Sequence, residues 1–414
     1  MVATLGVAAI VLSGCSAAAD DEPIGGSGVA IPAVPALPPM GWNSWNSFGC
    51  DIDEQRIEAQ ADAMVSSGMA AAGYRYVVID DCWYSPGRAA DGTLVADQAR
   101  FPSGMKALAD RLHGQGLQLG IYSGASDLMC AQLAGSYPGR TGSEGHERQD
   151  AATFASWGVD FVKYDWCSND SDLDRQIRDF TAMRDAIRDT GRPMVFSINP
   201  NSGVAAKLPG AKHDWGGVAT MTRVTNDITP VWETPQGPDG YQGVHDIIDA
   251  ASELTDRVSP GRWIDPDMLE IGVGDALTPE QQRSHLAMWA MMAAPLIAGN
   301  DLTQMSPATA QLLTTPGIVA IDQDQLGTAG SPTDLDRDIW TRHLTGGALA
   351  VALFNPGDAP REMTVTPADL GVEGTVTDAW TGAPVTSTAT ITMTVAPGDT
   401  AVLRIDPPDS GGFG

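Results

Sequence analysis

A chain of 414 residues with 43% hydrophobic content is long enough to form two folded domains, each with its own core. Its 52 acidic residues outnumber 24 basic ones, and the net charge of −28 would repel phosphate backbones and anionic lipids, which argues against nucleic acid as a partner. The six histidines lie far apart without HxH or HExxH spacing, so we expect no transition-metal site.

The first fifteen residues, MVATLGVAAIVLSGC, form an apolar run that is too short to span a membrane. The run resembles a bacterial lipoprotein signal with Cys15 as the lipidated residue, although it lacks the usual opening Lys or Arg. A chance cysteine after an apolar stretch is the alternative. We expect an extracytoplasmic protein, secreted or attached to the membrane only through Cys15, with residues 16–38 as an Ala-, Pro- and Gly-rich flexible tether.

From residue 39 to 327, apolar strand patterns alternate with amphipathic helix patterns. Strands are expected at 40–46, 74–81, 117–123, 159–165, 193–199, 218–226, 262–267 and 295–300. Helices are expected at 53–72, 103–115, 146–157, 172–190, 243–257 and 278–293. This alternation predicts an α/β fold, a (β/α)8 barrel, and eight strands suit its closure. An open doubly wound sheet is the alternative, but no Gly-rich phosphate fingerprint follows the first strand.

Short strands with frequent turn residues dominate residues 328–410. The expected strands are 338–344, 348–354, 361–365, 375–380, 388–395 and 399–405. The pattern predicts a small C-terminal antiparallel β-sandwich that carries no obvious chemistry.

Five of the barrel-type strand runs end in acidic residues, at Asp81, Asp165, Asp227, Asp267 and Asp301. Catalytic groups of (β/α)8 barrels lie at the C-terminal ends of the strands, and two carboxyl groups are the minimum for cleaving a glycosidic bond. The chain is therefore predicted to be an enzyme.

Asp165 is the candidate nucleophile of this set. The strand period of two places Phe161, Lys163 and Asp165 on one face, which we expect to be the barrel interior. Lys163 beside Asp165 would lower the carboxyl pKa and keep the group anionic. A structural ion pair is the alternative reading.

Asp227, four residues after Arg223, is the candidate acid and base, because neighbouring negative charge and partial burial can keep a carboxyl group protonated at neutral pH. A turn or helix-capping aspartate is the alternative.

Asp80 and Asp81 are adjacent and suit vicinal sugar hydroxyls or a cation. Three tryptophans near strand ends, Trp42, Trp83 and Trp166, could offer flat faces to a sugar ring, although each alone is more often core packing.

Four cysteines remain after Cys15, namely Cys50, Cys82, Cys130 and Cys167, and an oxidising exterior could pair them in three ways. Cys82 and Cys167 each follow a strand-end aspartate by two residues. Bridges there would brace loops beside the proposed site.

Several motifs together resemble glycoside hydrolase family 27, the α-galactosidase and α-N-acetylgalactosaminidase family. They are MGWNSWN at 40–46, IDDCW at 79–83, GIYS at 120–123, KYD at 163–165, DPDML at 265–269, AAPL at 293–296 and IDQDQLG at 321–327. The resemblance implies a retaining exo-acting enzyme that releases terminal α-linked galactose from oligosaccharides or polysaccharides, with Asp165 as nucleophile and Asp227 as acid and base.

The resemblance also implies the residues that bind the sugar. They are Trp42, Asp80, Asp81, Tyr122, Lys163, Arg223, Asp267 and Met268, together with Asn199 from the loop after the fifth strand. It further implies disulfides Cys50–Cys82 and Cys130–Cys167, a C-terminal β-sandwich, and no metal or cofactor.

One loop departs from the family pattern. Family members usually carry Cys-Glu-Trp after the fifth strand, where this chain has Ile198-Asn199-Pro200-Asn201. Because that loop faces position 2 of the sugar, a β-L-arabinopyranoside, an α-N-acetylgalactosaminide or an isomaltodextran-type α-glucan is an alternative substrate. A non-catalytic sugar-binding lipoprotein and a metal-dependent hydrolase are more distant alternatives.

Overall fold

A computed structural model describes residues 36–235, 240–386 and 389–408. The predicted signal segment with Cys15 and most of the predicted tether therefore lie outside the described residues.

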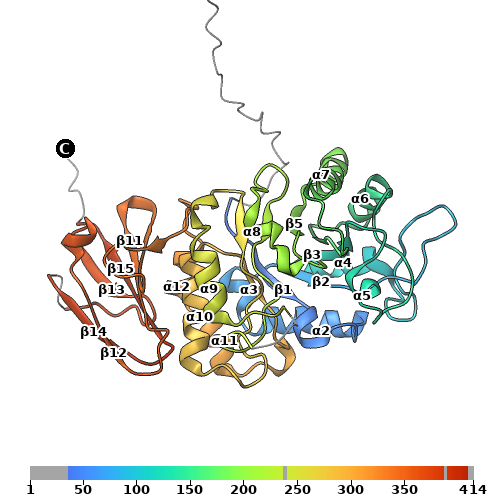
Figure 1. Ribbon diagram of the computed structural model, residues 1–414. Coiled ribbons are helices and arrows are strands. Elements are labelled where there is room, and N and C mark those ends of the chain that lie inside the picture. Colours follow the sequence, from blue (N-terminus) through green and yellow to red (C-terminus); the bar gives the residue numbers. More distant parts are fainter. Residues whose placement is uncertain (1–35, 236–239, 387–388, 409–414) are drawn as a thin grey trace, which may run out of the picture. The chain divides into compact units, whose positions relative to one another are not determined.

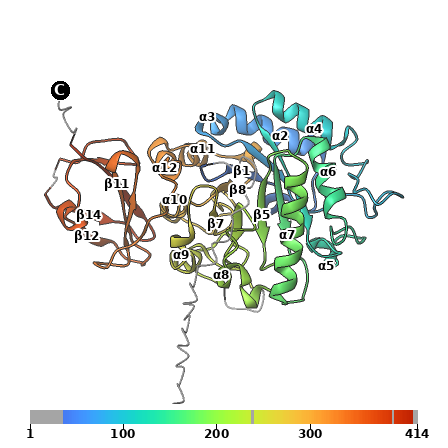
Figure 2. The ribbon, with the colours of Figure 1, turned by 90° about the horizontal axis from the view of Figure 1, so that it is seen from above.

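The first sheet is a parallel barrel (Figures 1 and 2). Its strands are β1 (Met40–Asn43), β2 (Tyr76–Ile79), β3 (Gln118–Gly124), β4 (Phe161–Asp165), β5 (Val195–Asn199), β6 (Met221–Arg223), β7 (Trp263–Asp265) and β8 (Leu296–Ala298). The strand order is β7-β6-β5-β4-β3-β2-β1-β8, and a parallel bridge between Leu269 and Ala298 closes the ring. The predicted (β/α)8 barrel is confirmed, and the open doubly wound sheet is wrong.

Helices cover the outer side of these strands, as Figure 2 shows for α2, α4, α6 and α7. The long helices are α2 (Glu54–Ser66), α4 (Gly104–Gly114), α6 (Glu147–Trp157), α7 (Leu173–Asp189), α9 (Val244–Ser252) and α10 (Pro279–Met291). Side chains at the N-cap start three of them, because Asp53, Asp172 and Thr278 each accept a hydrogen bond from the backbone N–H three residues on.

Two predicted helices are shorter or divided. The predicted helix 53–72 breaks at Gly68, which has φ = 89°, so that α2 is followed by a separate α3 (Met69–Ala72). The predicted helix 243–257 ends at Ser252 and is followed by the 3₁₀ turn Thr255–Arg257. The short helices α1 (Trp45–Phe48), α5 (Cys130–Leu133), α8 (Pro209–Lys212), α11 (Pro307–Leu313) and α12 (Pro316–Asp322) were not predicted, because four to seven residues carry too little periodicity.

The C-terminal strands form two antiparallel sheets with their own apolar core. One sheet has the order β13-β15-β11-β10-β9 and the other pairs β12 with β14. The strands are β9 (Ser331–Pro332), β10 (Ile339–His343), β11 (Leu349–Phe354), β12 (Arg361–Val365), β13 (Thr375–Asp378), β14 (Ile391–Val395) and β15 (Thr400–Asp406). The predicted β-sandwich is confirmed, and β9 is the strand that the pattern missed.

Helix α10 is buried on all sides along its second half, from Ser284 to Met291. Its partners on the C-terminal strands are specific: the Ser284 hydroxyl donates to Gly398 O at 2.7 Å and lies 2.6 Å from the Thr400 hydroxyl. The Arg342 guanidinium of β10 donates to Ala290 O and to Asp322 O. A helix enclosed by other elements on all sides needs no polar face, which explains its weak amphipathic pattern.

No helix in the described part of the chain is long and apolar enough to cross a membrane.

Candidate active site

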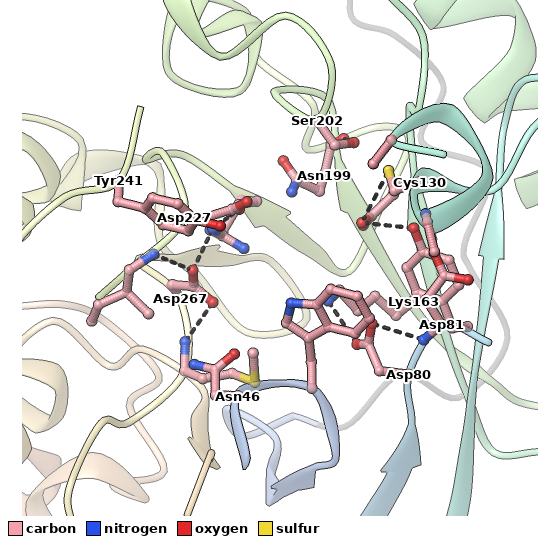
Figure 3. A pocket seen from close by; sticks show the side chains of 18 of the residues that line it. Asn46, Asp80, Asp81, Cys130, Lys163, Asn199, Ser202, Asp227, Tyr241 and Asp267 are labelled. Carbon is pink, nitrogen blue, oxygen red and sulfur yellow. Dashed lines mark hydrogen bonds and ion pairs between the residues drawn. The ribbon is translucent and has the colours of Figure 1, made fainter. Parts of the chain in front are cut away.

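A pocket of about 200 Å³ opens at the C-terminal ends of the barrel strands (Figure 3). Ten of the residues that the sequence singled out line it: Asp80, Asp81, Tyr122, Lys163, Asp165, Asn199, Arg223, Asp227, Asp267 and Met268. They come from β3, β4, β5 and β6 and from the loops after β2, β6 and β7. Strand ends therefore bring together side chains that lie up to 188 positions apart in the sequence.

Asp165 is the last residue of β4, and its two carboxylate oxygens differ in hydrogen bonding. Tyr122 on the neighbouring strand donates to its Oδ2 at 3.1 Å. Its Oδ1 is buried and has no hydrogen-bond partner among the described residues. The carboxyl group is thus oriented by one oxygen while the other keeps its lone pairs for a reaction.

Lys163 makes its direct contact with Asp80 and not with Asp165. Its Nζ donates to Asp80 Oδ2 at 2.7 Å, and Asn43 donates to the same oxygen at 2.7 Å. Burial raises the pKa of Asp165 to about 7; Lys163 lowers that pKa, while Asp80 and Asp227 raise it. The expectation that Lys163 holds the Asp165 pKa below its usual value is therefore wrong, because burial outweighs the cation.

Asp81 fastens a neighbouring loop as well as lining the pocket. Its Oδ2 accepts from Ala131 N at 2.7 Å, and its Oδ1 accepts from Cys82 N at 2.7 Å and from the Tyr84 hydroxyl. Burial raises the pKa of Asp81 to about 6, against the lowering effect of these hydrogen bonds. Asp81 thus connects the loop after β2 to α5.

Both disulfides implied by the family resemblance are present, Cys50–Cys82 and Cys130–Cys167. Cys82 and Cys167 have φ values of 74° and 49°, a backbone conformation that non-glycine residues seldom adopt. The bridges therefore hold two sharp corners directly after Asp80–Asp81 and after Asp165.

Arg223, at the end of β6, joins two carboxylates. Its guanidinium lies 2.6 Å from Asp227 Oδ1 and also contacts Asp267 Oδ2. Asp267 has φ = 87°, accepts from Ile228 N at 2.8 Å, and has a pKa that burial raises to about 6 despite Arg223. The arrangement fixes the loop after β6 against the loop after β7.

Asp227 is open to solvent. Its side chain is 63% exposed, so the partial burial that the sequence analysis expected is not observed. Its neighbours around the pocket are strongly acidic, since five carboxyl groups face two cations, Lys163 and Arg223. Such a field favours a positively charged transition state, as the oxocarbenium-like state of glycoside hydrolysis is.

The three tryptophans suggested as sugar platforms do not reach the pocket. Trp42, Trp83 and Trp166 are fully buried, and each indole N–H donates to a backbone carbonyl, of Asn300, Tyr122 and Asp170 respectively. Trp42 in particular points into the core because it belongs to β1. The tryptophan that lines the pocket is Trp45, which lies just past the strand. Trp45 is 37% exposed.

The end of β5, where the chain departs from the family pattern, brings the expected Asn199 to the pocket. Asn199 is in register with Asp165 and lines the pocket, whereas Ile198 is in register with Tyr164 and is buried outside it. Asn199 Oδ1 accepts from Asn201 N at 3.0 Å, and Figure 3 shows the side chain directed into the pocket. Asn199 and Ser202 therefore line this side of the pocket, and Ile198 does not.

Asp301, the fifth acidic strand end, lies elsewhere. Its carboxylate accepts from Gln60 Nε2 at 2.7 Å and from Thr303 N at 2.9 Å, outside the pocket. It caps a 3₁₀ turn, which is the ordinary structural role of such an aspartate.

Sequence reasoning missed eight residues that line the pocket: Trp45, Asn46, Ala131, Ala134, Ser136, Ser202, Ile228 and Tyr241. Trp45 and Asn46 belong to the motif 40–46, and the end of β1 at Asn43 is what turns them toward the opening. Tyr241 lies in a loop without any periodic pattern, so no sequence signal pointed to it.

One group of potential metal ligands lies close together in the described part of the chain, formed by Cys130, Asp165 and Cys167. The two cysteines form a disulfide, so their sulfur atoms are not thiolate ligands.

Comparisons with known families agree with this geometry. Residues 37–324 match the family model described as alpha galactosidase A, and residues 334–405 match the alpha galactosidase C-terminal beta sandwich domain.

Individual relatives share the same description. The chain is 46% identical over 317 residues to alpha-galactosidase A of Cellvibrio japonicus, covering 75% of this chain and 74% of the relative. The crystal structure of alpha-galactosidase I from Mortierella vinacea superimposes with a TM-score of 0.82 at 31% identity, covering 91% of this chain and 99% of that one. An alpha-galactosidase from Saccharomyces cerevisiae, in a structure with raffinose, gives a TM-score of 0.77 at 27% identity, covering 90% and 98%.

Proposed function

Because this chain belongs to glycoside hydrolase family 27, the α-galactosidase family, we propose that its pocket cleaves terminal α-linked galactose with Asp165 as nucleophile and Asp227 as acid and base. The enzyme is a retaining, exo-acting α-galactosidase.

The observation that carries this assignment is the contrast between the two carboxyl groups. Asp165 is 6% exposed, is oriented by Tyr122 and keeps Oδ1 unpartnered among the described residues. Asp227 is at the open side of the same pocket, where a leaving group can depart. A buried nucleophile and an accessible proton donor are the two parts of a retaining mechanism.

In the first step, Asp165 Oδ1 attacks the anomeric carbon and forms an ester bond. The glycosidic C–O bond breaks as Asp227 gives its proton to the departing oxygen. In the second step, the Asp227 carboxylate takes a proton from water, the water oxygen attacks the anomeric carbon, and the ester bond to Asp165 breaks. Two inversions leave the released galactose in its original α configuration.

The remaining polar residues are proposed to orient the sugar. Asp80 and Asp81 lie beside Lys163, and their carboxylates can accept hydrogen bonds from vicinal hydroxyls. Asn199 supplies an amide on the side of the loop after β5, and Asn46 lies in the wall near Asp267 (Figure 3). Met268, whose backbone N–H donates to Asp267 Oδ1 at 2.7 Å, completes this wall. Galactose is thereby enclosed by fixed groups that need little rearrangement.

The location is extracytoplasmic, since disulfides persist in oxidising compartments and the folded chain holds two. Lipidation at Cys15 stays a proposal; mass spectrometry of the membrane fraction would show the acylated cysteine, and an unmodified soluble protein would contradict it.

The direct test is hydrolysis of nitrophenyl α-D-galactopyranoside beside the α-N-acetylgalactosaminide, β-L-arabinopyranoside and α-D-glucopyranoside. We expect the galactoside to be preferred, and Asp165→Asn to lower kcat by about 10⁴-fold or more. Asp227→Asn should lower kcat/KM by about 10²- to 10⁴-fold on an alkyl galactoside and far less on α-galactosyl fluoride, which needs no proton donor. Azide should rescue Asp165→Asn as a galactosyl azide of inverted configuration.

Preference for another glycoside would keep the mechanism and replace the sugar. Undiminished activity in Asp165→Asn, or activity lost to a chelator, would refute the assignment.

A further inference from the structure

Among the described residues, two large aromatic side chains are exposed, and both lie at the pocket. Trp45 is 37% and Tyr241 is 51% exposed, and both line the pocket. The other exposed large hydrophobic residues are aliphatic and lie outside it: Val65, Leu173, Leu326 and Leu335. An aromatic ring left in water at the mouth of a binding site is an unused contact surface.

The Tyr241 side chain has no bonding partner among the described residues. No hydrogen bond, ion pair or ring contact of this side chain is found within residues 36–235, 240–386 and 389–408. The hydroxyls of Tyr74, Tyr84, Tyr122 and Tyr137 have partners, and the Tyr164 hydroxyl, which has none among the described residues, is buried in the core. Hydrogen bonding among the described residues therefore does not account for a tyrosine at position 241.

The backbone around Tyr241 is nevertheless held in place beside Asp227. Gln242 N donates to Asp227 O at 2.8 Å, and Thr229 N donates to Gln242 O at 2.9 Å. The Gln242 side chain also accepts from Asn226 N at 2.8 Å. These three bonds fix Tyr241 next to the proposed proton donor, as Figure 3 shows.

The proton donor locates the leaving group. The oxygen that Asp227 protonates belongs to the group attached to galactose, so that group must pass over the open side of Asp227. Tyr241 borders that side, whereas Asp80, Asp81 and Cys130 lie across the pocket from it (Figure 3). The ring of Tyr241 thus faces the leaving group and not the galactose.

We propose that Tyr241 forms the subsite for the leaving group, where its ring packs against the apolar C–H face of the pyranose to which galactose is attached. The inference rests on the proposed function. An exposed tyrosine has a flat apolar body and a hydroxyl that can bond to sugar hydroxyls, at a small cost in conformational entropy. Such contacts, made far from the breaking bond, help to position it.

The test compares two substrates that both need the proton donor but differ in the leaving group: melibiose, which releases glucose, and methyl α-D-galactopyranoside, which releases methanol. We expect Tyr241→Ala to lose about tenfold more kcat/KM on melibiose than on the methyl galactoside, the size expected for one aromatic contact. Tyr241→Phe should keep most of the preference. Leu326→Ala, which removes an exposed apolar side chain outside the pocket, should leave both values unchanged.

Each other result counts against the subsite. Equal losses on the two substrates, or no loss on either, would overturn it while leaving the α-galactosidase assignment intact. A wild-type enzyme that hydrolyses neither substrate and also fails on α-galactosyl fluoride would overturn the proposed function, and the subsite with it.

Discussion

At the scale of single residues, the two proposed catalytic aspartates differ mainly in their surroundings. Asp165 is enclosed by Tyr122, Lys163 and the Cys130–Cys167 bridge, whereas Asp227 is held by a single guanidinium at the open side. Two chemically identical side chains can take different roles when one is desolvated and the other remains accessible.

Lys163 tunes the nucleophile although it does not touch it. Burial raises the pKa of Asp165 to about 7, and Lys163 opposes that shift, so Lys163→Met should raise the pKa further. Because only anionic Asp165 reacts, the acid limb of the pH profile of kcat/KM should move upward by about one unit, and the smaller anionic fraction should by itself lower kcat/KM at pH 7 by about fivefold. The profile should be measured with nitrophenyl α-D-galactopyranoside.

Lys106 on α4 provides a matched control, since it is exposed and pairs only with Asp110 among the described residues. Lys106→Met should leave the profile unchanged. An acid limb in Lys163→Met that stays where the wild type has it would show that Lys163 does not influence Asp165.

At the scale of elements, the loops after β2 and β4 are the parts that most need support. Each loop contains a cysteine with positive φ shortly after the strand, and a disulfide joins that cysteine to a segment more distant in the sequence. The bridges close loops of similar length, with sequence separations of 32 and 37. The two bridges differ in their distance from the pocket, because Cys130 lines it while Cys50 and Cys82 do not.

Removing either bridge should therefore cost similar stability but different activity. The double variants Cys50→Ala/Cys82→Ala and Cys130→Ala/Cys167→Ala should each lower the free energy of unfolding by about 2–4 kcal/mol. Only the second variant should also lower kcat at a temperature where both remain folded, because it frees the loop that contacts Asp165. Denaturant unfolding and steady-state kinetics measure the two effects, and an equal loss of kcat in both variants would contradict this division.

The sequence was informative where the structure is regular. Alternation and periodicity predicted all eight barrel strands, with ends within three residues, because β2 and its neighbours are buried on both faces and read as continuous apolar runs. Strand ends then located the acidic residues of the pocket. Trp42 was misassigned because the exact end of β1 decides whether a side chain enters the core or the pocket, and Tyr241 was missed because a loop contact leaves no pattern.

At the scale of the whole molecule, helix α10 makes the barrel and the C-terminal strands depend on one another. Its buried stretch from Ser284 to Met291 has partners on both, including Asp267 O for Trp289 and Gly398 O for Ser284. Apolar residues of both parts also belong to one continuous core cluster. We expect them to unfold in a single transition.

Ser284→Ala tests this coupling with a minimal change. It leaves Gly398 O and the Thr400 hydroxyl without a buried partner and should cost about 1–3 kcal/mol. Calorimetry should show one transition, shifted to lower temperature. Ser66→Ala on the exposed end of α2 is the control and should leave Tm unchanged; two separate transitions, with only one shifted, would contradict the coupling.

Buried carboxyl groups make the stability of the whole protein depend on pH. Burial raises the pKa of Glu270 and of Asp322 to about 8, the first next to Asp267 and the second despite Arg342. Their ordinary values are 4.5 and 3.8, so between about pH 4 and pH 8 the folded state binds more protons than the unfolded state. Stability should therefore fall as pH rises through this window, by up to about 1.4 kcal/mol per pH unit for each group.

Glu270→Gln isolates one of these groups, because glutamine keeps the oxygen that accepts from Asn46 and cannot ionise. At constant ionic strength, the variant should lose less Tm than the wild type between pH 5 and pH 8 and should be the more stable of the two at pH 8. Glu362→Gln, at an exposed position of β12, should follow the wild-type curve. A steeper decline in Glu270→Gln would contradict this account, because Glu270 would then have to be ionised in the folded enzyme and compensated by a cation that outweighs burial. The negative charge of Asp267 acts in the opposite sense, since it raises the pKa of Glu270.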